Sequence, residues 1–301
     1  MMSDSLTPSL SPFGREGQKD KIDFCDRLVV IATMHRKELV IAPILQTSLG
    51  VRVAVPQNFD SDLFGTFTRD VDRPANQVET AKLKAETGLE LIDADLAIAS
   101  EGSFFPHPML GIACNREIVL LLDKKHNFTV YGESLSTDTN FRHQEISSYE
   151  QAYDFALKVG FPDHAIVLMQ DAKTSAKEAI YKGITSEDLL KESVHKLLKQ
   201  SSQIHIETDM RSLYNPTRMS NIAKATEDLV RKLQQFCLHC NFVNFDVVKK
   251  IKGLPCELCG LPTQVTRTHV YQCDRCQFQQ EELFPSGIKT ADPMYCNYCN
   301  P

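Results

Sequence analysis

Eight cysteines constrain this chain more than any other feature of its sequence. They form four Cys-x-x-Cys pairs near the C-terminus: Cys237/Cys240, Cys256/Cys259, Cys273/Cys276 and Cys296/Cys299. The first residues are polar and lack the apolar stretch of a secretory signal, so we expect a reducing compartment in which disulfides are disfavoured. Four such pairs therefore predict metal binding, most simply by zinc.

The spacing of the pairs leaves more than one way to divide the thiolates between two sites. Thirteen residues separate Cys259 from Cys273, a spacing typical of a zinc ribbon, which favours a nested arrangement. In that arrangement the two inner pairs form one site and the two outer pairs close the second. The rival is a sequential arrangement that joins the first pair to the second. Four thiolates fill a tetrahedral Zn²⁺ shell, so two structural ions are expected, with disulfides or iron–sulfur clusters as alternatives.

Charge argues against nucleic acid as a partner. Residues 237–301 carry six Lys or Arg and six Asp or Glu, and the whole chain has a formal net charge of −6. Metal-bound thiolates would make the tail more negative, whereas a phosphate-binding surface needs positive charge. A protein partner for the tail stays open. With no apolar run near the roughly 20 residues of a membrane span, we expect a soluble cytoplasmic protein that does not bind membranes.

The first part of the chain divides into a polar start and a patterned region. Residues 1–22 are rich in Ser, Pro and Gly and are predicted to be a disordered tail. An apolar run over 27–32 predicts a buried strand, and an apolar face over 41–49 predicts a helix that ends at Gly50. Residues 51–55 alternate like a second strand. The order strand, helix, strand predicts a β-α-β unit.

Further elements alternate in the same way. Helices are predicted over 78–89, 148–159, 186–199 and 216–236, and strands over 95–100, 117–123, 128–131, 165–169 and 204–207. Residues 101–111 are predicted to be a loop because Gly and Pro punctuate them. The fold class is therefore α/β, with a mixed, mainly parallel sheet flanked by helices over 23–236. A small zinc-ribbon-like tail follows at 237–301.

Four polar loops adjoin these elements, and α/β domains place their chemistry in such loops. Two loops lie at helix starts and supply phosphate-binding candidates: Thr33, His35, Arg36, Lys37, Arg211, Asn215 and Arg218. Two others carry carboxylates that could bind Mg²⁺ or activate water, namely Asp60 with Asp62, and Glu101 just beyond a strand. Each loop also has an ordinary explanation, as a capped helix or a solvated surface.

With these residues identified, the chain resembles an uncharacterised bacterial family known only as a domain of unknown function. The matching stretches are IATMHRKE, FDSDLFGTFT, ASEGSFFPHP, TNF at Thr139–Phe141, and DMRSLYNPTRM. The Cys-x-x-Cys tail belongs to the same resemblance, which covers nearly all of residues 27–301. The resemblance implies no established activity.

A weaker resemblance links residues 28–103 to the pyrophosphatases that act on inosine and xanthosine triphosphates. It rests on Lys37 in a polar turn, on the run from Glu79 to Ala85 and on Glu101-Gly102, and Asn215–Arg218 could correspond to a late basic motif. It implies that Glu79 and Glu101 serve catalysis. Met34-His35, the extra Asp60 and Asp62 loop and the zinc tail depart from that group, so substrate and reaction could differ.

Two hypotheses follow from the sequence. In the first, the protein is a metal-dependent hydrolase of a phosphoanhydride in a nucleotide or related compound. Its carboxylates, Asp60, Asp62, Glu79 and Glu101, would bind Mg²⁺ or activate water, and the basic residues would neutralise phosphate. In the second, it is a non-catalytic adaptor that binds a partner through its tail and senses a small anion. The first hypothesis requires the acidic and basic loops to meet in one pocket.

Overall fold

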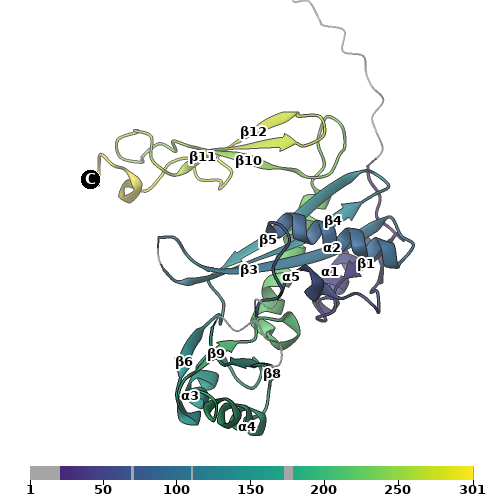
Figure 1. Cartoon of the computed structure of the whole chain (residues 1–301). Coiled ribbons are helices and arrows are strands. Elements are labelled where there is room, and N and C mark those ends of the chain that lie inside the picture. The colour runs from purple at the N-terminus through teal and green to yellow at the C-terminus, as the bar shows by residue number, and fades with distance from the viewer. Residues whose placement is uncertain (1–20, 69–70, 110, 173–178, 301) are drawn as a thin grey trace, which may run out of the picture. The chain divides into compact units, whose positions relative to one another are not determined.

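The computed structural model describes residues 21–68, 71–109, 111–172 and 179–300 (Figure 1). The predicted disordered tail, 1–22, lies almost entirely outside them. The chain divides into two compact units, Phe24–Leu233 and a second unit built on the residues from Gln234 onward. Among the described residues, no helix is both long and apolar enough to cross a bilayer.

A five-stranded sheet forms the larger part of the first unit. Its strands are β1 (Leu28–Ala32), β2 (Arg52–Ala54), β3 (Leu96–Pro106), β4 (Ala113–Asp123) and β5 (Phe128–Ser136), in the order β2-β1-β3-β4-β5. β1 runs parallel to both of its neighbours, whereas β3, β4 and β5 pair antiparallel. The sheet is mixed as predicted, but the expectation of a mainly parallel sheet is wrong. The connections after β3 and β4 are too short to carry the chain back for parallel pairing.

The predicted β-α-β unit is confirmed at the start of this sheet. Helix α1 (Glu38–Leu49) joins β1 to β2 and ends at Gly50, whose φ of 68° is the left-handed conformation favoured after a helix. Helix α2 (Gln77–Leu91) begins at Asn76, which accepts hydrogen bonds from two backbone N–H groups. Alanines of α2 pack on alternate residues of β1, β3 and β4, and this forms one hydrophobic core.

Strand β3 is longer than the sequence predicts. Residues 101–106 continue the strand that was expected to end at Ser100, and they pair with β4 over their whole length. The prediction of a loop over 101–111 is therefore wrong for its first half. Gly102 and Pro106 are accommodated because the ladder to β4 supplies hydrogen bonds that local propensity does not reveal. Glu101 consequently lies inside a sheet rather than beyond a strand end.

A second sheet has four antiparallel strands. It contains β6 (His143–Ile146), β7 (Ile166–Met169), β8 (Ile180–Ile184) and β9 (Ile204–Thr208), in the order β6-β9-β7-β8. Helices α3 (Tyr149–Val159) and α4 (Glu187–Leu198) pack on it, and each begins at a serine whose hydroxyl accepts a backbone N–H. Strands β6 and β8 were not predicted from the sequence, because both are short.

Helix α5 (Pro216–Gln234) lies against β5 on the face of the five-stranded sheet opposite α2. Tyr131 and Leu120, which are paired in register, belong to the α2 side, so Gly132 and its partner Val119 face the other way. A Cβ on Gly132 would overlap backbone atoms of the facing turn of α5. The glycine therefore permits the close approach of helix and strand.

The second unit contains a three-stranded antiparallel sheet. Its strands are β10 (Phe245–Lys252), β11 (Thr266–Cys273) and β12 (Gln279–Leu283), in sequential order. Four Cys-x-x-Cys pairs flank these strands: before β10, between β10 and β11, at the end of β11, and after the short helix η4 (Pro293–Tyr295). Because successive strands run in opposite directions, alternate pairs lie at the same end of the sheet.

Replacing Gly132 by alanine should destabilise the first unit by about 2 kcal/mol, because the added methyl group forces α5 away from β5. The urea midpoint measures this change. Leu135→Ala on the same strand is the matched control, since Leu135 is exposed and its loss should cost less than about 0.5 kcal/mol. Equal midpoints for the two variants would contradict the close packing.

Candidate functional site

The eight cysteines of the tail form two groups that could each hold a metal ion. One consists of Cys237, Cys240, Cys273 and Cys276, and the other of Cys256, Cys259, Cys296 and Cys299. The first and third pairs thus share one site, and the second and fourth pairs share the other. Both the nested and the sequential arrangements expected from spacing are wrong. The antiparallel strands decide the pairing, because β10 carries the chain from one end of the sheet to the other and β11 brings it back.

The sulfur atoms have the separations that a tetrahedral metal site requires. A Zn–S bond of roughly 2.3 Å places the sulfurs of a tetrahedron about 3.8 Å apart. The observed Sγ–Sγ distances are 3.6 Å for Cys237–Cys276 and Cys240–Cys273. They are 3.6 Å for Cys259–Cys296 and 3.9 Å for Cys256–Cys299 in the other group. A disulfide would need about 2.05 Å, so these groups fit a metal and not a disulfide.

The four Cys-x-x-Cys turns share one backbone geometry. In each, the residue after the second cysteine donates its N–H to the carbonyl oxygen of the first: Asn241 to Cys237, Gly260 to Cys256, Gln277 to Cys273 and Asn300 to Cys296. Gly260 has a φ of 73°, which lies in the left-handed region that glycine adopts without strain. The turns are thus shaped by local hydrogen bonds, which hold both thiols of a pair on one side.

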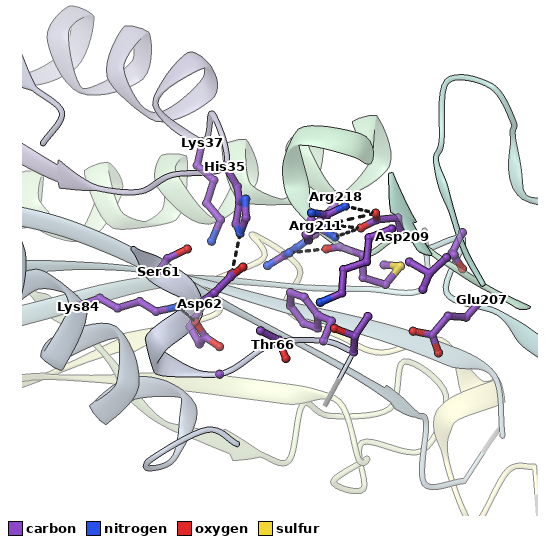
Figure 2. Close-up of a pocket in the computed structure, with 18 residues that line it drawn as sticks. His35, Lys37, Ser61, Asp62, Thr66, Lys84, Glu207, Asp209, Arg211 and Arg218 are labelled. Atoms are coloured by element: carbon purple, nitrogen blue, oxygen red, sulfur yellow. Dashed lines mark hydrogen bonds and ion pairs between the residues drawn. The ribbon is translucent and has the colours of Figure 1, made fainter. Parts of the chain in front are cut away.

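The first unit contains a polar pocket into which all four predicted loops send side chains. His35 and Lys37 come from the loop after β1, Asp62 from the second loop, Glu101 from β3, and Arg211 with Arg218 from the segment after β9. Figure 2 shows His35, Lys37 and Asp62 on one side of this space and Arg211 with Arg218 on another. Basic and acidic candidates therefore meet, although they are separated by up to 183 positions in the sequence.

Lys37 is the most unusual group in the pocket. It is 7% exposed, and among the described residues its ammonium makes one hydrogen bond, to the Ser100 carbonyl at 3.4 Å, and no ion pair. The pKa of Lys37 is lowered to about 7, first by burial and then by the nearby charges of Arg218 and Lys84, which outweigh the opposite effect of Glu101 and Glu117. A buried amine with a strongly lowered pKa makes this pocket a candidate functional site.

Glu101 is buried in an ion-paired cluster. Its two carboxylate oxygens lie 2.6 Å from Arg73 and 2.6 Å from Lys84. Burial alone would raise the pKa of Glu101, but Lys84, Lys37 and Arg73 outweigh it and lower the pKa. Both oxygens are therefore occupied by basic groups, and Glu101 contributes to stability as well as to the pocket.

Arg218 connects the two sheets of the first unit. Its guanidinium lies 2.6 Å from Glu117 on β4 and donates to the carbonyl of Met210 after β9. It also stacks over the ring of Phe67, 4.4 Å from the centroid. Gly102 makes room for this pair, since a Cβ there would lie 2.7 Å from a carboxylate oxygen of Glu117. The pair holds Arg218 in one orientation at the edge of the pocket.

Asp62 is the most accessible carboxylate in the pocket, with 38% of its side chain exposed. His35 Nε2 lies 3.1 Å from it, and this hydrogen bond is the main cause that lowers the pKa of Asp62. Burial lowers the pKa of His35, so the imidazole is neutral near pH 7. The His35 Nδ1 atom is buried without a hydrogen-bond partner among the described residues. Asp62 is thus an ionised carboxylate with one face open to solvent.

Several pocket residues were not predicted as site residues. They include Ser61, Lys84, Lys182, Glu207 and Asp209. Lys84 had a signal in the sequence, because it shares a helical face with Ala81, three positions earlier, and a lysine is unexpected on the buried face of α2. Lys182 had none, since it lies on the missed strand β8. Asp209 holds Arg211 through hydrogen bonds to the arginine's backbone and side chain.

Other predicted residues lie outside the pocket lining: Thr33, Arg36, Asp60, Glu79 and Asn215. Asp60 begins the short helix η1 (Ser61–Phe64) by accepting the N–H of Asp62, and Asn215 likewise accepts the N–H of Arg218 at the start of α5. Within the described residues, the groups close enough to share one ion are both all-cysteine. The expected carboxylate site for Mg²⁺ is therefore not preformed among them.

The chain belongs to a family described as a domain of unknown function (DUF6671), whose match spans residues 84–301. The match includes both cysteine groups and three of the five stretches on which the first resemblance rests; IATMHRKE and FDSDLFGTFT precede it. A search of curated proteins found no match.

The lowered pKa of Lys37 predicts an unusual effect of pH on stability. Between pH 7 and 10.5 the unfolded chain holds a proton on Lys37 that the folded chain has released, so this residue's contribution to stability rises with pH in that range. Lys37→Met should therefore stabilise the protein at about pH 6 and lose most of that advantage at about pH 10. Urea midpoints of variant and wild type at the two pH values measure the difference.

The matched control is Lys84→Met, the same substitution at a buried lysine that has an ion-pair partner. It leaves Glu101 with one partner fewer, so it should destabilise the protein, as breaking buried pairs does. A Lys37→Met variant that is less stable than wild type in acid would show that Lys37 is not a desolvated cation.

Proposed function

We propose that the pocket of the first unit binds a small phosphate compound, in the simplest case a nucleotide, and hydrolyses a phosphoanhydride bond in it. The observation that carries this proposal is the meeting of basic side chains from separate elements around Lys37, which has no carboxylate partner of its own among the described residues. An anionic ligand would supply the missing partner. Phosphoryl transfer depends chiefly on positioning and electrostatic stabilisation, which fixed cations provide.

Three basic side chains are suited to phosphate. Lys37 and Arg218 are buried and held in place, and Arg211 is fixed by Asp209 with part of its side chain still exposed. Lys37 donates to the Ser100 carbonyl, Arg218 pairs with Glu117 and Arg211 pairs with Asp209, so these side chains are already held in place before a ligand enters. Preorganised charge of this kind stabilises negative charge that develops on phosphate oxygens.

Asp62 is the best-placed residue to activate water. Its carboxylate is ionised and accessible, whereas both oxygens of Glu101 are occupied by Arg73 and Lys84. In this role Asp62 takes the proton of a water molecule that attacks phosphorus, and the leaving phosphate departs as the P–O bond breaks. Mg²⁺ would enter with the substrate, held mainly by its phosphates, as is usual for this ion.

For the second unit, we infer two structural Zn²⁺ ions, one in each cysteine group. Four thiolates at tetrahedral separations suit zinc and leave no coordination position for a substrate. Thiolate ligands also require a reducing environment, which fits a cytoplasmic location. The zinc sites would stabilise a sheet in which every residue of the third strand, β12, is exposed.

The alternative is a non-catalytic protein that senses a small anion in the pocket and binds a protein partner through its tail. That hypothesis permits the acidic and basic loops to lie on separate faces, whereas they line one pocket. Binding of a phosphate compound without turnover would favour it.

A panel of nucleotides with Mg²⁺, assayed for released phosphate and pyrophosphate, tests the hydrolase proposal. On the substrate that the panel identifies, Asp62→Asn should reduce kcat by about 10²-fold or more, the range for loss of an acid–base group. Asp60→Asn is the matched control, because this carboxylate lies two positions away and outside the pocket lining, and asparagine can still begin helix η1. Equal losses in both variants, or no turnover of any compound, would count against the proposal.

Paired cysteine variants test the metal sites and their pairing. Cys237→Ser/Cys273→Ser removes two ligands from one group, so zinc content should fall from two ions per chain to one. Cys237→Ser/Cys296→Ser removes one ligand from each group and should weaken the binding of both ions. Elemental analysis after dialysis against a weak chelator measures this difference. If Cys237→Ser/Cys296→Ser instead loses one ion while Cys237→Ser/Cys273→Ser weakens both, the nested arrangement is right. A wild-type protein that carries no zinc would contradict the inference of zinc sites.

A further inference from the structure

A second hollow continues from the polar pocket and has a different lining. The two share Thr66, Phe67, Glu207 and Met210, so they adjoin. Beyond the shared residues, the second hollow is lined by the aromatic rings of Phe104 and Phe141. A charged cavity thus adjoins a partly aromatic one.

The aromatic rings form an ordered platform. The rings of Phe104 and Phe141 are stacked, with centroids 5.5 Å apart and planes 28° from parallel. Phe67 meets Phe104 edge to face at 5.4 Å. All three rings are only partly buried, although they lie beside a pocket rich in charge. Arg218 lies over the rings of Phe67 and Phe104, 4.4 Å and 5.6 Å from their centroids. The part of such a cluster that stays exposed is suited to stack against another flat ring.

Polar groups surround this platform on the side of β3. Arg73 donates hydrogen bonds to the Ser103 hydroxyl at 3.1 Å and to the Gly102 carbonyl at 2.8 Å, and it also pairs with Glu101. The same arginine therefore contacts both the part of β3 that precedes Phe104 and the ion-paired cluster of the polar pocket. The arrangement of one apolar surface and a few fixed polar groups is typical of a small-molecule site.

We propose that this hollow is a subsite for the aromatic base of a nucleoside phosphate, which stacks on Phe104 and Phe141 while its phosphates occupy the polar pocket. The inference rests on the proposed function, because it assigns the phosphates to the site described above. It narrows the ligand from phosphate compounds in general to those that carry a flat ring. A bare polyphosphate or a sugar phosphate would leave the aromatic rings uncovered.

Binding measurements on the full chain without Mg²⁺ test the subsite apart from hydrolysis. The probes are inorganic tripolyphosphate and five nucleoside triphosphates, those of adenosine, guanosine, cytidine, uridine and inosine. At least one nucleotide should bind about tenfold more tightly than tripolyphosphate, which is the effect of stacking one base on aromatic side chains. Isothermal titration calorimetry gives both dissociation constants.

Phe141 provides the sharpest variants, because it lines the aromatic hollow but not the polar pocket. Phe141→Leu keeps apolar bulk and removes the ring, so it should abolish the preference for the nucleotide and leave tripolyphosphate binding within about twofold. Phe141→Tyr keeps the ring and should retain the preference. Photolabelling of the wild-type chain with 8-azidoadenosine triphosphate, which needs no variant, should modify the peptide that contains Phe141.

The outcomes separate the two proposals. If tripolyphosphate binds and no nucleotide binds more tightly, the aromatic subsite is wrong while the anion pocket stands. The subsite is also overturned if Phe141→Leu keeps the nucleotide preference, or if the label is confined to peptides outside the hollow. If neither tripolyphosphate nor any nucleotide binds, the proposed function fails and the subsite fails with it.

Discussion

The buried ion pair between Arg218 and Glu117 is the contact on which the first unit most depends. Arg218 is 2% exposed and Glu117 is fully buried, so each charge requires the other. Through this pair, α5 is joined to β4 of the five-stranded sheet. Through the Met210 carbonyl it is also joined to the segment after β9 of the four-stranded sheet. A single side chain thereby sets the spacing of the elements that surround the pocket.

The rest of the pocket follows from the same constraint on buried charge. Glu101 is balanced by Lys84 and Arg73, and Asp209 is balanced by Arg211. Lys37 differs, because no carboxylate pairs with it among the described residues. A desolvated cation costs stability, and proteins retain such costs where a ligand or a reaction uses them. The electrostatics thus single out Lys37 as the group that an anionic ligand would satisfy.

The second unit depends on a different kind of interaction, the proposed binding of metal by its cysteines. Its outermost strand, β12, has no buried residue, so apolar packing alone provides little for this part of the sheet. Each cysteine group instead joins two turns that are distant in sequence. One group joins the turn before β10 to the β11–β12 connection, and the other joins the β10–β11 connection to the turn after η4. Metal held by such groups contributes folding free energy directly. The unit can therefore be stable without a large core of its own.

Local patterns in the sequence determined the elements and the ligand types. The β-α-β unit over 27–55, the serine-capped helices α3 and α4 and the geometry of each Cys-x-x-Cys turn all depend on residues within a few positions of one another. Such interactions can be read from spacing. The hydrolase hypothesis required the acidic and basic loops to meet in one pocket. Glu101 and Arg218 both line that pocket, whereas Asp60, the third residue expected there, does not, and its neighbour Asp62 does.

Tertiary structure alone decided the relations between distant residues. Antiparallel pairing of β3, β4 and β5 made the five-stranded sheet less parallel than expected, and pairing with β4 extends β3 beyond Glu101. In the second unit, the strand directions bring alternate cysteine pairs together instead of nested ones. The tertiary structure also places Lys182, from an unpredicted strand, in the pocket lining and leaves Asp60 outside it. These outcomes depend on which segments become neighbours, and the partners of an ion pair such as Arg218 and Glu117 lie 101 positions apart. Local propensity carries no information over that separation, because the contact forms only when the whole unit has packed.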